Sequence, residues 1–79
     1  MDEIKVGDIY LHSKSGNKYK VNALAKHSET LEDLVVYEAL YENPRSKIWV
    51  RPLAMWNEEV EIGDIKVPRF VKFDKDENF

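Results

Sequence analysis

The chain has 79 residues, a formal net charge of -3 and no cysteine. A chain this short forms one domain, residues 1–79, near the smallest size at which apolar burial alone sustains a fold. Disulfides and thiolate metal sites are excluded, and His12 and His27 lie in separate segments, so we expect no metal and no cofactor.

The polarity of the chain bears on its location and its partners. No window holds the roughly 18 consecutive apolar residues that cross a bilayer, and the first residues are too acidic for a secretory signal. We therefore expect a cytoplasmic protein without membrane association, whose polar residues 74–79 fray. The negative net charge disfavours nucleic acid as a partner, because binding to phosphates relies on clustered Lys and Arg.

The first two predicted elements form a hairpin. A strand is expected at Asp8–Lys14, and it ends at Ser15-Gly16-Asn17, a typical turn sequence. The returning strand, Lys18–Lys26, alternates with a period of two. Its apolar face is predicted to carry Tyr19, Val21, Ala23 and Ala25.

The next segment admits two interpretations. As a helix, it would be capped by Thr30, with Asp33 three residues later, and would stop at Asn43-Pro44. As a strand over Leu34–Tyr41, it would place its β-branched and aromatic side chains on a pleated surface. We favour the strand, antiparallel to Lys18–Lys26. Because both of its faces are largely apolar, we expect it to be covered on both sides.

Short elements complete the chain. Lys47–Arg51 is predicted to be a strand, Pro52–Trp56 a single helical or 3₁₀ turn, and the segment around Gly63-Asp64 a final hairpin. Within the turn, Leu53 and Trp56 are spaced to share one side. The pattern indicates a mainly β fold of five or six short antiparallel strands, and closure into a small barrel would remove the exposed edges.

Three consecutive blocks resemble a known family. "YKVNALAKHSETLEDLVVYEALYE", "WVRPLAMW" and "VPRF" are similar to the bacterial family catalogued as domain of unknown function 1653, over roughly Gly7 to Phe73. The resemblance implies a small, soluble, SH3-like β domain and assigns it no activity. Trp56 stands where the family pattern favours Phe, and the segment "ENPRSK" is longer than the usual turn.

Trp49 and Arg51 are the first candidate binding residues. Two apart on a strand, they present an aromatic plane and a planar guanidinium to the same side, which suits stacking on a ring or pairing with a carboxylate. The alternative is that Trp49 packs in the core while Arg51 pairs with an acid such as Glu38. Tyr37, His27 and Arg69 are the other candidate ligand-binding residues, although an edge-strand arginine is commonly solvated or paired.

The segment His27-Ser28-Glu29 has the residue types of a hydrolytic site. Adjacent side chains on an extended backbone diverge, however, and no oxyanion loop accompanies them, so we predict a polar turn and no catalytic residues. The leading functional hypothesis is a noncatalytic binding module for a small ligand or peptide. The alternatives are a nucleic-acid adaptor that stacks on unpaired bases and a small hydrolytic enzyme that uses His27.

Overall fold

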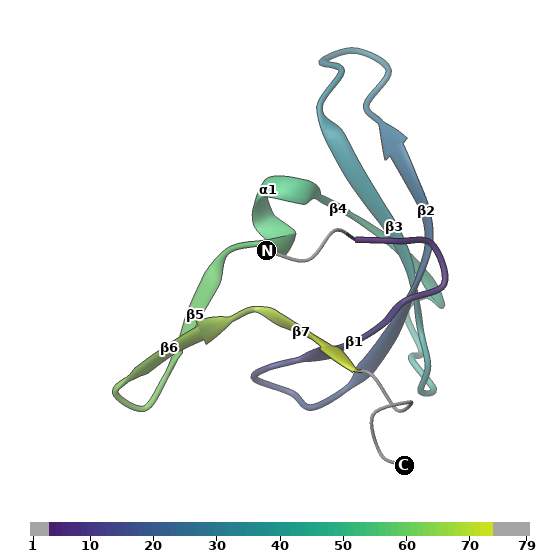
Figure 1. The fold of residues 1–79 in the computed structure, drawn as a ribbon. Coiled ribbons are helices and arrows are strands. Elements are labelled where there is room, and N and C mark those ends of the chain that lie inside the picture. The colour runs from purple at the N-terminus through teal and green to yellow at the C-terminus, as the bar shows by residue number, and fades with distance from the viewer. Residues whose placement is uncertain (1–3, 74–79) are drawn as a thin grey trace.

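The computed structural model describes residues 4–73, and the prediction that residues 74–79 fray falls outside them. The described residues form seven strands and one helical turn, shown in Figure 1. Within them, no helix has the length and apolarity needed to span a bilayer. In chain order the elements are β1 (Ile9–His12), β2 (Lys18–Lys26), β3 (Asp33–Ala39), β4 (Ile48–Pro52), α1 (Leu53–Trp56), β5 (Glu59–Ile62), β6 (Ile65–Pro68) and β7 (Phe70–Phe73).

The strands form two antiparallel sheets. Five strands are ordered β4-β3-β2-β1-β7, and β5 pairs with β6 in a separate hairpin. The mainly β, antiparallel character is therefore confirmed. The expectation of a closed barrel is not met by residues 4–73, because their larger sheet ends at β4 and β7, which do not pair with each other. The hairpin of β5 and β6 projects away from the larger sheet, so it does not bridge the two ends (Figure 1).

The predicted pairing of the second and third strands is confirmed. β2 and β3 are antiparallel neighbours, with Tyr19 opposite Ala39 and Lys26 opposite Asp33. A strand, not a helix, therefore occupies this segment, and it ends at Ala39 where the sequence pattern predicted Tyr41.

The predicted faces of β2 are wrong beyond Val21. The register shifts between Val21 and Ala23, so that Val21 lies opposite Tyr37 while Ala23 lies opposite Val36. A β-bulge inserts one extra residue and reverses the side-chain alternation that follows it. Ala23 and Ala25 therefore leave the core face.

Only one face of β3 is fully covered. Val35, Tyr37 and Ala39 are buried, whereas the side chains between them are half-buried. The expectation that both faces are covered is therefore wrong. The physical reason is that α1, which follows β4 directly, packs against β3 and β4 from the core side alone.

The core centres on an aromatic cluster. Trp56 is only 2% exposed, and its ring stacks on Phe70 with centroids 3.8 Å apart and an interplanar angle of 8°. Tyr10 and Tyr37 meet the Trp56 ring edge-on, with centroids at 5.3 and 5.0 Å. Leu53 packs against the same cluster, which confirms that Leu53 and Trp56 share one side of the turn.

The free edge of β4 is protected locally. The Ala39 N–H donates to the Lys47 carbonyl, so Lys47 and every second residue after it form the hydrogen bonds to β3. The backbone groups of Ile48, Val50 and Pro52 therefore point away from β3. The Ser46 hydroxyl accepts from the Ile48 N–H at 3.2 Å and donates to the Ile48 carbonyl at 2.7 Å. Because Pro52 has no N–H, Val50 is the only residue of β4 whose outward N–H remains available to an incoming strand.

The buried position of Trp56 predicts a large stability loss in Trp56→Ala. Truncating a buried aromatic leaves a cavity and removes ring contacts, so we expect a loss of about 3–5 kcal/mol in the free energy of unfolding. Met55→Ala is the matched control, because Met55 occupies the same turn but is 40% exposed. Its loss should stay below about 1 kcal/mol in urea unfolding. Equal losses in the two variants would contradict the placement of Trp56.

Candidate functional site

A cleft of about 490 Å³ lies where β2, β3, β4 and the connection between β3 and β4 meet. We call it the aromatic cleft. It combines four aromatic rings, two arginines, an asparagine and a proline. These residues are Tyr19, Tyr37, Tyr41, Asn43, Pro44, Arg45, Trp49 and Arg51.

The strand register explains how three of the predicted residues meet there. Tyr37 lies opposite Trp49, and Val35 lies opposite Arg51, so both β4 side chains share the face of β3 that bears Tyr37. Ile48 and Val50 occupy the opposite face, as the alternation in the sequence predicts.

Arg51 does not pair with Glu38. Glu38 lies opposite Ile48 on the other face, where its carboxylate is 3.5 Å from the Lys47 ammonium. The suggested ion pair between Glu38 and Arg51 is therefore wrong, because successive side chains of a strand point to opposite faces.

Trp49 belongs to both the core margin and the cleft. Its half-buried ring packs against the core, while its indole N–H donates to the Ser46 carbonyl at 3.0 Å. Packing on one part of the ring and a hydrogen bond on another restrict its rotation. Trp49 therefore forms a fixed wall of the cleft.

A chain of polar groups crosses the cleft. The Asn43 amide donates to the Tyr41 hydroxyl at 3.0 Å, and the Tyr41 and Tyr19 hydroxyls are 2.9 Å apart. Burial, together with the hydrogen bond to Tyr41, raises the pKa of Tyr19 to about 12. The Tyr19 hydroxyl therefore remains protonated at neutral pH, which suits hydrogen bonding and not proton abstraction.

The two arginines give the cleft a positive character. Arg51 donates through Nε to the Tyr37 hydroxyl at 3.4 Å, and its guanidinium carbon lies 5.5 Å from the Phe70 ring centroid. No Asp or Glu lines the cleft. Within residues 4–73, neither Arg51 nor Arg45 forms an ion pair. This local charge contrasts with the net charge of the whole chain, which is -3.

His12 lies beside this positive region, from β1. Its ring meets the Phe70 ring edge-on at 5.1 Å. Burial lowers the pKa of His12 below its ordinary value of 6.5, and the positive charges of Arg51, Arg69 and Lys14 lower it further. His12 therefore responds electrostatically to Arg51 although it does not line the cleft.

The other two predicted binding residues lie outside the aromatic cleft. Arg69 directly precedes β7, and its guanidinium is 3.1 Å from the Glu58 carboxylate. His27 begins the turn between β2 and β3, where its Nδ1 accepts the backbone N–H groups of Glu29 at 3.1 Å and Thr30 at 3.3 Å. A binding role for either residue remains a prediction.

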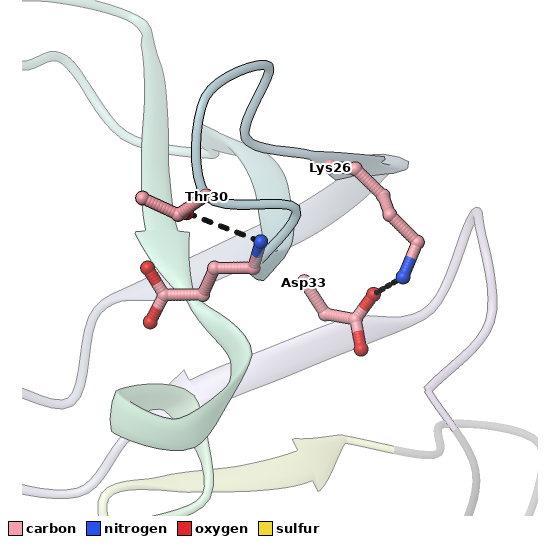
Figure 2. A network of polar contacts seen from close by, with 4 residues as sticks. Lys26, Thr30 and Asp33 are labelled. Carbon is pink, nitrogen blue, oxygen red and sulfur yellow. Dashed lines mark hydrogen bonds and ion pairs between the residues drawn. The ribbon is translucent and has the colours of Figure 1, made fainter.

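The turn after His27 is held together by its own polar groups. Figure 2 shows the ion pair between Lys26 and Asp33, at 2.7 Å, which closes its base. The Thr30 hydroxyl accepts the Glu32 N–H at 3.2 Å, as expected for a short polar side chain in a turn. The Ser28 hydroxyl contacts the Glu29 carboxylate at 3.4 Å, and His27 Nδ1 is occupied by backbone donors. These contacts form a structured turn, and among residues 27–33 they pair no nucleophile with a base.

The residues of this region that were not selected from the sequence include Tyr19, Arg45 and His12. The position of Tyr19 could have been predicted, because antiparallel pairing of β2 with β3 places Tyr19 on the same face of the sheet as Tyr37. Arg45 lies in an irregular connection, whose path has no periodicity to read. His12 depends on the pairing of β1 with β7, at opposite ends of the sequence.

The electrostatic surroundings of His12 predict acid sensitivity. Its pKa is lower in the folded state, so the unfolded chain binds more protons as the pH falls below about 6.5. The His12 contribution to stability is therefore complete above that pH and is lost as the pH falls toward the lowered pKa. Urea unfolding between pH 7 and pH 5 should show a smaller decline for His12→Gln than for the parent, whereas His27→Gln should retain the decline. An unchanged decline in His12→Gln would contradict this explanation.

Comparison with known proteins places the chain in a family. A solved structure described as a DUF1653 protein from Bordetella bronchiseptica is similar, with 38% identity and a TM-score of 0.76; the match covers 86% of this chain and 85% of that one. A search of curated proteins gave no match. The family model described as a protein of unknown function, DUF1653, matches residues 8–72. The chain therefore belongs to the DUF1653 family.

Proposed function

We propose that this domain is a noncatalytic recognition module that binds a small ligand or a peptide in the aromatic cleft. The observation that carries the proposal is the pairing of arginine and aromatic side chains there. Arg51 and Arg45 line the cleft beside four rings, and neither has an acidic partner within residues 4–73.

Several side chains of the aromatic cleft are held in place before a ligand binds. Rigid aromatics and arginines contribute most of the energy at many recognition sites, because they make several contacts at small entropic cost. Trp49 is fixed by Ser46, and the Tyr19, Tyr41 and Asn43 side chains are linked by hydrogen bonds. A ligand that enters the cleft therefore orders few side chains.

The β4 edge supports the cleft as the binding region. Peptides are often recognised by adding a strand to a free sheet edge. Here Ser46 occupies both outward backbone groups of Ile48, and Pro52 has no N–H. Strand addition at the β4 edge beside the cleft is therefore restricted, which favours binding of a peptide ligand through side-chain contacts in the cleft.

Stacking on an unpaired nucleic-acid base is the second candidate. The aromatic rings and the two arginines of the cleft favour it, because such sites bind bases by stacking. The overall negative charge opposes it. Steep weakening of oligonucleotide binding with added salt, at the same cleft residues, would support this candidate over a small ligand or peptide.

A chemical-shift titration locates the functional surface. Isotope-labelled protein is mixed separately with pools of anionic metabolites, proline-rich peptides and short single-stranded oligonucleotides. We expect at least one pool to shift signals of Tyr19, Tyr37, Tyr41 and Trp49 together. Shifts that concentrate in residues 27–32, with the cleft signals unchanged, would contradict the proposal.

Arg51→Lys tests whether the Arg51 guanidinium contributes to binding the ligand that this titration identifies. The substitution keeps the charge but removes the planar fork, so affinity for a ligand that bears a carboxylate or phosphate should fall about tenfold. Arg69→Lys is the matched control, because Arg69 is also half-buried but pairs with Glu58 outside the cleft. Thermal unfolding should confirm that both variants are folded. Equal affinity of Arg51→Lys and the parent would show that Arg51 does not hold the ligand.

A further inference from the structure

The side chains of the aromatic cleft specify the chemistry of its ligand further, given the recognition function proposed for the cleft. We infer that the aromatic cleft binds a small planar molecule that carries an oxyanion, either a carboxylate or a phosphate. The oxyanion is held by Arg51 together with Arg45, and the planar ring lies against Trp49.

The geometry of Arg51 leaves one side of its guanidinium available. Its Nε donates to the Tyr37 hydroxyl, and Phe70 lies close to the guanidinium carbon. The two terminal nitrogens have no hydrogen-bond partner among the contacts of residues 4–73. Two parallel N–H groups on a fixed guanidinium match the two oxygens of a carboxylate or phosphate.

Four acids of residues 4–73 are engaged in ion pairs outside the aromatic cleft. The four ion pairs of the described residues pair carboxylates with Lys26, Lys47, Lys72 and Arg69. None of these acids lines the aromatic cleft. A half-buried arginine without a counterion carries a desolvation cost that a bound oxyanion would offset.

The dimensions and the walls favour a small ring. A volume of about 490 Å³ falls within the range of small-molecule sites. The fixed Trp49 ring offers a flat apolar surface, and the Tyr19 and Tyr41 hydroxyls supply hydrogen bonds at the cleft floor. One aromatic ring with one oxyanion uses both kinds of surface.

His12 provides an independent reporter of the bound charge. The groups that act on it are Lys14 in the turn after β1, Arg51 on β4 and Arg69 before β7, all of them positive. An oxyanion on Arg51 offsets part of that positive field, so the bound state favours protonated His12. By thermodynamic linkage, protonation of His12 then strengthens binding of the oxyanion to the same extent.

The test measures the pKa of His12 from its ring nitrogen signals, with phenyl phosphate, benzoate, inorganic phosphate or benzyl alcohol present. We expect phenyl phosphate or benzoate to shift the cleft signals and to raise the His12 pKa. Inorganic phosphate should bind more weakly than phenyl phosphate, and benzyl alcohol should leave the His12 pKa unchanged. The comparison of phenyl phosphate with benzoate decides which oxyanion is preferred.

Two matched variants locate the effect. Arg51→Gln and Arg69→Gln each remove one positive charge that acts on His12, so each should raise the His12 pKa without any probe. In Arg51→Gln the further rise with phenyl phosphate should disappear, and its affinity should fall about tenfold or more. In Arg69→Gln the further rise should persist.

Three outcomes would overturn the inference. They are benzyl alcohol binding as tightly as the anions, anion binding that leaves the His12 pKa unchanged, and no anion binding at millimolar concentration. If proline-rich peptides still bind in the cleft, the proposed function stands while this inference fails. If no ligand pool perturbs the cleft, both fail.

Discussion

The stacking of Trp56 on Phe70 is the interaction on which the rest of the structure depends. Trp56 ends the single turn α1, and Phe70 begins β7, so one contact joins the middle of the chain to its last described strand. Tyr10 of β1 and Tyr37 of β3 close around the Trp56 ring. A domain of 79 residues has a small core, so these few rings supply much of its buried apolar surface.

The same cluster forms the support beneath the aromatic cleft. Phe70 meets Tyr19 and Tyr37 edge-on at 6.0 Å, and both tyrosines line the cleft. The Arg51 guanidinium lies over the Phe70 ring, and His12 meets that ring from β1. Phe70 thus couples the stability of the core to the proposed ligand binding, although Phe70 itself does not line the cleft. A cationic cleft can form in this acidic chain because the strand register places Glu38 on the opposite face from Arg51, and no Asp or Glu lines the cleft.

Local patterns in the sequence predicted the parts of the fold that depend on local physics. The alternation at Lys18–Lys26, the proline before Leu53 and the glycine at position 63 each correspond to an observed element. Trp49 and Arg51 were placed on one face because strand periodicity requires it. The residue types do not indicate the bulge after Val21, so the faces predicted for Ala23 and Ala25 were wrong. The open sheet and the position of His12 depend on contacts between distant segments, which periodicity does not encode, and Arg45 lies in an irregular connection without periodicity.

The most direct test of this coupling is the affinity of Phe70→Leu for phenyl phosphate, measured where circular dichroism shows that the variant is folded. Leucine retains apolar volume but removes the ring that supports Arg51, Tyr19 and Tyr37. Affinity should fall about threefold or more, as expected from loss of a cation–π contact and of preorganisation, although Phe70 does not line the cleft. A folded Phe70→Leu variant that binds phenyl phosphate as tightly as the parent would contradict this coupling.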